Sequence, residues 1–188
     1  MDKTFVSRRF FTFGALAGVS VTAACGNGVG GSGAAMIDAR VDSALAEMYR
    51  RYPNTQSLAD KANGMLVMPL VTEAGFGLGG AYGRGALRVG GVTVDYYSAT
   101  QVSGGLQIGA QQYAHVLFFM TEDALTDFRR SPGWAAGGDL EYVISDKGDG
   151  LSADTTTALA PVLAAVFGRA GIKAGATLQG TKYTRIIP

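Results

Sequence analysis

The sequence predicts an α+β domain in which a glycine-rich antiparallel β-sheet curls into a barrel or half-barrel, with an N-terminal amphipathic helix and a few short helices. Three observations lead to this prediction. Apolar residues at helical spacing open the domain, and two later stretches carry helix start and stop signals. Between them lie short apolar or alternating runs separated by glycine, which is 28 of the 188 residues. Such glycines favour close backbone approach or strong sheet curvature.

The first helix is expected over Met36–Tyr52, where apolar residues return at three- and four-residue steps before Pro53 ends the pattern. We expect this helix to pack on the domain's own sheet; a membrane-inserting face is the alternative. A shorter helix is expected over Ser57–Asn63. Thr121 should cap a third helix that continues through Arg130, with acids in its first turn and arginines in its last.

Strands are expected wherever apolar runs or strict alternation recur. Gly90-Gly91 is typical of a two-residue hairpin turn. The segment Ala158–Phe167 is ambiguous, since it fits a helix as well as a strand. The expected strands are Met65–Val71, Gly75–Tyr82, Gly85–Val89, Val92–Ser98, Gly105–Gln111, His115–Met120, Asp139–Ser145, Val162–Arg169, Ile172–Gln179 and Tyr183–Ile187.

Residues 1–24 have the pattern of an export signal. A basic start is followed by the apolar run Phe10–Val21 and by small residues. The pair Arg8-Arg9 favours the twin-arginine route. Thr12 and Phe13 replace the residues expected next in that motif, so the Sec route stays open.

Cys25 follows the signal and is the only cysteine. Thr22-Ala23-Ala24-Cys25 resembles a bacterial lipobox, in which the cysteine is acylated and becomes the new N-terminus. Two or more acyl chains, such as palmitate, would give a stable anchor. Residues 25–35 then form a glycine-rich tether, and 36–188 form one domain. We expect a protein lipid-anchored to the periplasmic face of a bacterial membrane, the outer one slightly favoured. A cleaved signal with an incidental cysteine, or an uncleaved anchor helix, is the alternative.

Composition excludes several functions. Residues 1–24 carry three of the 16 Lys/Arg and one of the 15 Asp/Glu, so the remaining chain is nearly neutral. Nucleic-acid binding needs a strongly basic face, and we therefore expect none. The single cysteine leaves no partner for an internal disulfide.

No motif for catalysis, metal or cofactor binding stands out. His115 is the only histidine and lies in an apolar strand pattern, so a Ser-His-Asp triad would have to include it. A GxGxxG match that begins at Gly75 continues into more strand pattern instead of opening a helix. Asp146 and Asp149 fit a turn better than a calcium loop. We expect a protein that is not an enzyme and has neither cofactor nor metal.

Several short motifs occur in a fixed order: AxGMLVMP (62–69), AGFGLGGAYGRGALRV (74–89), VDYYSA (94–99) and GLQIGAQ (105–111). Together they resemble the SYLF domain, the lipid-binding module also found in yeast actin-patch SH3 proteins. The segments LFFMTEDALTDFR (117–129), GWAAGGDL (133–140) and FGRAGIKAGATLQGTKYTRI (167–186) are similar to its bacterial lipoprotein branch. The resemblance extends from about Ala44 to Ile187.

The resemblance implies phosphoinositide and membrane binding in eukaryotic members and actin binding in the yeast ones. For a bacterial envelope protein this narrows to anionic phospholipid or another envelope lipid. The accompanying SH3 domain is absent, so no proline-rich partner is implied. The alternative function is a non-catalytic interaction or structural module that holds an envelope protein partner.

Headgroup binding requires clustered cations, preferably arginine. Three cations lie in the N-terminal helical segment, which the resemblance places at the membrane. Two arginines at even spacing should share one sheet face, and three alternating glycines leave one strand face bare for an acyl chain or headgroup. Solvated surface charge is the alternative for each cation. The candidate lipid-binding residues are Arg50, Arg51, Lys61, Arg84, Arg88, Gly75, Gly77 and Gly79.

Overall fold

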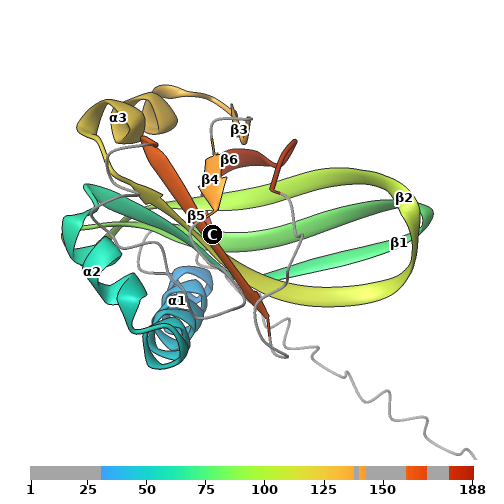
Figure 1. Ribbon diagram of the computed structural model, residues 1–188, viewed down its shortest axis with the longest axis horizontal. Coiled ribbons are helices and arrows are strands. Elements are labelled where there is room, and N and C mark those ends of the chain that lie inside the picture. Colours follow the sequence, from blue (N-terminus) through green and yellow to red (C-terminus); the bar gives the residue numbers. More distant parts are fainter. Residues whose placement is uncertain (1–30, 138–139, 143–159, 169–177) are drawn as a thin grey trace, which may run out of the picture.

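The computed structural model describes residues 31–137, 140–142, 160–168 and 178–188. It confirms an α+β fold in which a sheet curls into a half-barrel (Figure 1). The sheet has the order β3-β6-β2-β5-β4, and β1 pairs with β2 outside this path. The elements are α1 (Ser32–Arg51), α2 (Asn54–Lys61), β1 (Gly64–Val89), β2 (Val92–Phe119), α3 (Glu122–Arg130), β3 (Trp134–Ala135), β4 (Leu140–Tyr142), β5 (Val162–Gly168) and β6 (Lys182–Ile186).

Two long strands form the frame of the fold. β1 has 26 residues and β2 has 28, and they pair antiparallel from Gly64↔Phe119 to Val89↔Val92. Gly90 and Gly91 make the predicted hairpin turn with φ values of 58° and 81°. We call this paired unit the ribbon. It folds back on itself, and its bend projects beyond the other elements (Figure 1).

The prediction of three short strands in each half of the ribbon was wrong. The six expected segments lie within β1 and β2, which are continuous apart from register shifts at Met68/Val71, Phe76/Leu78 and Leu87/Arg88. The glycines between these segments were interpreted as strand ends. In the ribbon, however, the ladder continues through Gly83 and Gly104, which lie between the expected segments.

β2 is the central strand because its two halves have different outer partners. Residues 96–100 pair with β6, and residues 113–119 pair with β5. β5 settles the ambiguous segment as a strand: its first six residues are all buried, as in a strand covered on both faces. The pair β4·β5 is parallel, which departs from the predicted antiparallel arrangement. Most of the expected strand Ile172–Gln179, as well as Asp146 and Asp149, lies outside the described residues.

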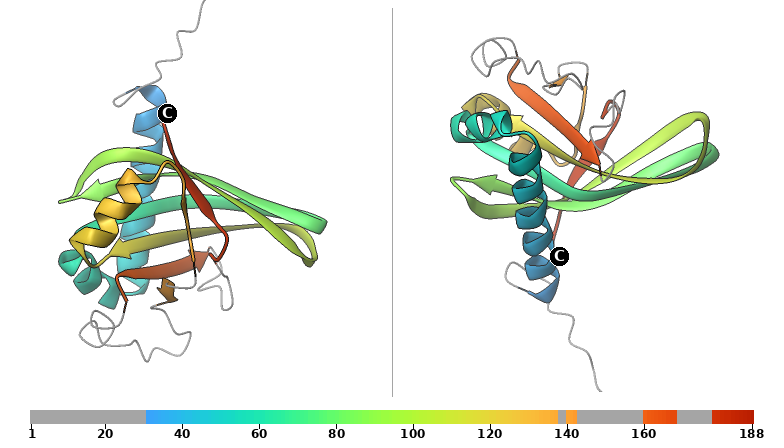
Figure 2. Two further views of the ribbon diagram at one scale, coloured as in Figure 1. Left: turned by 90° about the horizontal axis from the view of Figure 1, so that it is seen from above. Right: turned by 60° about the horizontal axis from the view of Figure 1, so that its bottom comes forward.

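Apolar side chains form two clusters, one on each face of the curled sheet. The inner cluster fills the half-barrel and includes Phe128 of α3. The outer cluster lies between the sheet and α1. α1 buries residues at three-, four- and seven-residue steps, which confirms that its apolar face packs on the domain's own sheet. Both views in Figure 2 show α1 crossing the ribbon steeply. The buried residues of α1 are Ala34, Ile37, Val41, Ala44 and Met48.

The helix boundaries confirm most of the capping predictions. Thr121 caps α3, since its hydroxyl accepts a hydrogen bond from the Ala124 N–H at 3.2 Å. α2 begins at Asn54, earlier than predicted, because Pro53 has a helical φ of −55° and starts the second helix while ending the first. No helix of the described part has both the length and the hydropathy to cross a bilayer. Arg8, Arg9 and Cys25 lie outside the described residues, so export and lipidation stay predictions.

Candidate functional site

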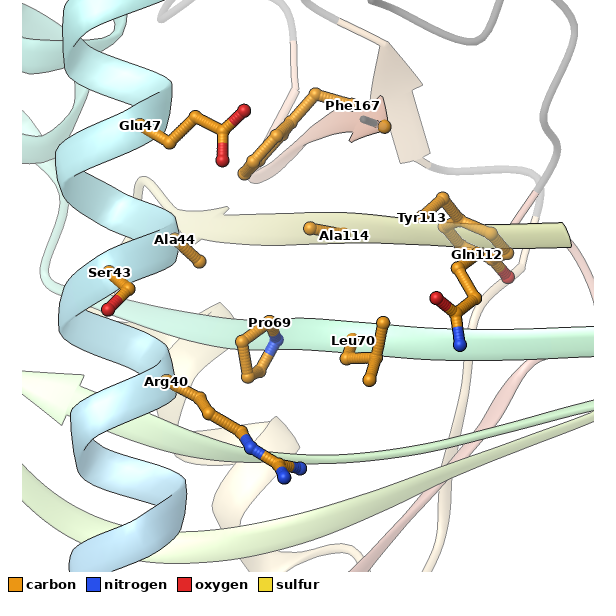
Figure 3. Close-up of a pocket in the computed structure, with 11 residues that line it drawn as sticks. Arg40, Ser43, Ala44, Glu47, Pro69, Leu70, Gln112, Tyr113, Ala114 and Phe167 are labelled. Carbon is orange, nitrogen blue, oxygen red and sulfur yellow. The ribbon is translucent and has the colours of Figure 1, made fainter. Parts of the chain in front are cut away.

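A groove runs between α1 and the outer face of the ribbon. Its larger part is a cavity of about 370 Å³ (Figure 3), and a second cavity of about 170 Å³ adjoins it. The two cavities share Arg40, Pro69 and Leu70 and therefore adjoin each other along α1; together we call them the α1 groove. The larger cavity extends along α1 to Glu47, and the smaller one extends to Arg84 on β1.

A β-bulge at Pro69 makes the floor of the α1 groove. The ladder register shifts between Met68 and Val71, so that Pro69 and Leu70 together oppose Ala114. Proline has no N–H to donate to a ladder, which explains the irregularity at this position. Met68 and Val71 both face the inner cluster, and this leaves the two residues between them to the outer side. The floor is therefore apolar and is formed by two consecutive side chains.

Small side chains keep the α1 groove open. Ala44 of α1 and Ala114 of β2 both line it and are each 8% exposed. Figure 3 shows them between the helix and the strands, with Pro69 and Leu70 beside them. Phe167 of β5 lies next to Glu47 at the end of the groove farther from Arg40 (Figure 3).

The charges in the α1 groove are distributed unevenly. Arg40 lines both cavities and Arg84 lines the smaller one, and both side chains are exposed. Within the described residues, neither guanidinium has an ion-pair or hydrogen-bond partner. At the other end, Glu47 is neutralised by Arg51, with 3.0 Å between Oε1 and Nη2. One end of the groove thus offers two cations to an external anion.

The structure separates the two arginines that were predicted to act together. Arg84 and Arg88 do share the sheet face toward α1, as their spacing predicts. Arg88, however, has acidic partners on α1: its Nη2 lies 2.7 Å from Asp42 Oδ1 and 3.9 Å from Asp38 Oδ1. Its Nη1 also donates to the Gly91 carbonyl at 3.1 Å. Arg88 thus holds α1 on the ribbon, whereas Arg84 faces the α1 groove.

The other candidate residues lie away from this cationic end. Arg50, Arg51 and Lys61 are exposed near the C-terminal ends of α1 and α2, and none of them lines either cavity. Gly75 and Gly79 lie in the outer part of the ribbon and line neither cavity, and Gly77 continues β1 between them.

Three contributors to the α1 groove were missed by sequence reasoning: Arg40, Pro69 and Gly83. A Cβ on Gly83 would lie 2.8 Å from the Leu70 carbonyl oxygen, so glycine permits the close approach of the two halves of β1 beside the groove. Pro69 within a strand pattern was a usable signal, because an internal strand proline indicates a bulge or an edge. Arg40 carried no such signal.

His115 lies in the barrel interior, away from the α1 groove. It is 0% exposed, and its Nε2 lies 2.8 Å from the Tyr183 hydroxyl. Burial lowers the pKa of His115 to about 3, so the imidazole is neutral near pH 7. In the described ranges, no group of three His, Cys, Asp or Glu side chains is placed to hold a metal ion.

Comparison with known proteins found a match to one protein family. Residues 100–185 match the model of the Ysc84 family, described as Las17-binding protein actin regulator. The matched range includes Ala114 and Phe167 of the α1 groove. No curated protein matches the chain. The family match over residues 100–185 agrees with the SYLF motifs, so this part of the chain is similar to the Ysc84 (SYLF) family.

Proposed function

We propose that this protein is a bacterial envelope lipoprotein whose SYLF domain binds anionic phospholipid or another anionic lipid. The observation that carries the proposal is the pair Arg40 and Arg84, which have no partner among the described residues and lie beside the apolar floor of the α1 groove. A guanidinium binds phosphate through two parallel hydrogen bonds, and apolar surface next to it suits the rest of a lipid. The family match supports a lipid-binding or actin-related module.

The position of the start of α1 supports this role for the proposed anchor. Cys25 precedes the start of α1 by seven residues, which span at most about 25 Å when fully extended. Met36 and Ile37, in the N-terminal half of α1, line the same cavity as Arg84. Acylated Cys25 would therefore hold the cationic end of the α1 groove close to the membrane surface.

A protein-interaction module is the alternative function. It is favoured by the description of the matched family, which names a protein partner. Such a module would use an exposed surface of α1 or the ribbon and would not depend on lipid.

Vesicle co-sedimentation tests the lipid proposal. The chain from Gly26, which cannot be acylated, should bind vesicles containing phosphatidylglycerol and should bind neutral phosphatidylcholine vesicles much more weakly. High salt should release it, because headgroup attraction is screened. Each basic residue near an anionic surface contributes about 1 kcal/mol, so Arg40→Ala/Arg84→Ala should weaken binding at least tenfold.

Two control pairs locate the contact. Arg129→Ala/Arg130→Ala removes the same charge from α3 and should leave binding nearly unchanged. Arg50→Ala/Lys61→Ala tests the C-terminal ends of α1 and α2. If the wild-type chain binds no vesicle in low salt, the lipid proposal fails and the interaction module takes its place.

Metabolic labelling with radioactive palmitate tests the anchor. The wild-type protein should incorporate label and fractionate with membranes, whereas Cys25→Ser should do neither. Arg8→Lys/Arg9→Lys should block export if the twin-arginine route is used, and unimpaired export of that variant would indicate the Sec route.

A further inference from the structure

We propose that the α1 groove holds a single acyl chain, with the anionic group of the same lipid at Arg40 and Arg84. The proposed ligand class is a monoacyl anionic amphiphile, such as a lysophospholipid, or one chain of a diacyl lipid. This inference rests on the proposed function and adds a defined site to it.

The polarity of the α1 groove sets the direction of the ligand. Two guanidinium groups that no described side chain pairs with lie at one end, the apolar floor lies in the middle, and the Glu47 carboxylate lies at the other end. An anion is attracted to the first end, whereas at the last end Arg51 offsets the charge of Glu47 and the groove offers no cation of its own. The hydrocarbon tail therefore extends from Arg40 toward Phe167.

The middle of the α1 groove suits hydrocarbon. Pro69 and Leu70 supply its floor, and Ala44 and Ala114 are too short to fill the space between helix and strands. The aromatic ring of Phe167 faces this space at the far end (Figure 3). The volume of about 370 Å³ lies in the usual range of small-ligand cavities.

The shape of the α1 groove limits it to one chain. It follows a single flank of α1, from Met36 to Glu47, a distance of about 16 Å at 1.5 Å per residue. Its width is the gap between one helix and the ribbon, in contrast to the broad cavity that two parallel chains need.

Calorimetric titration with lysophosphatidylglycerol below its micellar concentration tests the site. The full mature chain with Cys25→Ser should bind one molecule saturably. Glycerophosphoglycerol, which is the same phosphodiester without the acyl chain, should bind at least a hundredfold more weakly. Equal affinity for the two probes would overturn the acyl site and leave a headgroup site only.

Groove-filling variants locate the chain. Ala114→Leu and Ala44→Leu add bulk inside the α1 groove without touching either arginine, and each should weaken lysophosphatidylglycerol binding at least tenfold. Ala46→Leu makes the same change on the exposed face of α1 and should bind within twofold of wild type. Folded groove variants that bind like wild type would overturn the proposal.

Photo-crosslinking uses the wild-type chain, so its result is informative even if the groove variants fail to fold. A fatty acid with a diazirine in mid-chain should label wild-type peptides from 36–47 or around Ala114. Labelling confined to other peptides would contradict the site.

The vesicle and monoacyl-lipid experiments distinguish the two proposals. Vesicle binding without monoacyl-lipid binding would remove this inference and keep the proposed function. Monoacyl-lipid binding without vesicle binding would keep the acyl site and remove membrane binding.

Discussion

Asp38 carries most of the polar contact between α1 and the ribbon. Its Oδ1 accepts from the Thr93 hydroxyl and its Oδ2 accepts from the Tyr96 hydroxyl, both at 2.8 Å. Burial of Tyr96, together with its hydrogen bond to Asp38, raises the pKa of Tyr96 to about 12. The carboxylate therefore joins one turn of α1 to two positions on β2.

Replacing this carboxylate should loosen the helix. Asp38→Ala leaves two hydroxyl donors without their acceptor, and we expect the free energy of unfolding to fall by about 2 kcal/mol. The pKa of Tyr96, followed by ultraviolet absorbance, should shift down toward 10. Asp60→Ala removes an exposed carboxylate from α2 as a control and should change stability by less than about 0.5 kcal/mol. Equal effects of the two variants in urea titrations would contradict the role of Asp38.

His115 should make the stability of the protein depend on pH. In the unfolded chain its pKa is near 6.5, whereas in the fold burial lowers it to about 3. Between pH 6.5 and pH 3, His115 is protonated only in the unfolded state. Its contribution to the free energy of unfolding is therefore complete above pH 6.5 and is lost progressively as pH falls toward 3. From pH 7.5 to 5.0 the loss should be about 2 kcal/mol.

Urea unfolding of wild type and His115→Gln at the two pH values isolates this contribution. Glutamine keeps a polar partner for Tyr183 but does not titrate. The decrease in unfolding free energy between pH 7.5 and 5.0 should therefore be about 2 kcal/mol smaller in the variant. The same decrease in both proteins would show that other groups, not His115, cause the pH dependence.

At the scale of elements, the continuity of β1 depends on two close approaches between its own halves. A Cβ on Gly85 would overlap the Val67 carbonyl oxygen and lie 2.6 Å from the Met68 sulfur. A Cβ on Gly83 would lie too close to the Leu70 carbonyl oxygen and to a methyl group of Val71. Backbone atoms at these positions have no rotamer to change, so a methyl group forces the two halves apart.

Gly85→Ala should consequently destabilise the fold strongly, by about 3 kcal/mol, through overpacking. Gly137→Ala is the matched control, because nothing lies within 4 Å of a Cβ there and its φ is not positive. That variant should change the free energy of unfolding by less than about 0.5 kcal/mol. Thermal unfolding of both variants checks the comparison, and a stable Gly85→Ala protein would mean that the halves of β1 separate without cost.

Local signals predicted the helices well and the strands less well. The cap at Thr121 and the stop at Pro53 depend on a few neighbouring residues, which the sequence displays directly. Glycine gave an ambiguous signal, since it marks both the end of a strand and a bend within it. This ambiguity explains the breaks expected at Gly83 and Gly104, where the ladder in fact continues, but not those at residues 72–74 and 112–114, which contain no glycine.

The candidate site was predictable only in part. Even spacing placed Arg84 and Arg88 on one face, but the sequence did not show that Asp42 and Asp38 would pair with Arg88, whereas no described acid pairs with Arg84. The α1 groove depends on the bulge at Pro69 and on where α1 crosses the ribbon. Both are tertiary features, and so the importance of Arg40 could not be inferred from helical periodicity alone.

At the scale of the whole molecule, the α1 groove joins parts of the chain that are distant in sequence. Its lining comes from α1, β1, β2 and β5, so a ligand in it contacts the N-terminal helix and three strands together. α1 is also the element that follows the proposed anchor. A lipid in the groove would therefore contact both α1, the helix nearest the proposed anchor, and the central strands of the sheet.

Lipid binding should therefore stabilise the entire domain and not the helix alone. A ligand that binds only the folded state, at a free concentration one hundred times its Kd, adds about 2.7 kcal/mol. For a chain of this size that corresponds to a rise in Tm of roughly 5–10 °C. Calorimetry of wild type with lysophosphatidylglycerol below its micellar concentration should show this rise, and amides in α1 and β5 should exchange more slowly by similar factors. In Ala114→Leu the same lipid should leave Tm unchanged, because the added side chain occupies the ligand's place. A rise of equal size in that variant would mean that the lipid stabilises the fold from another surface, whereas slower exchange restricted to α1 would mean that the helix and the sheet respond separately.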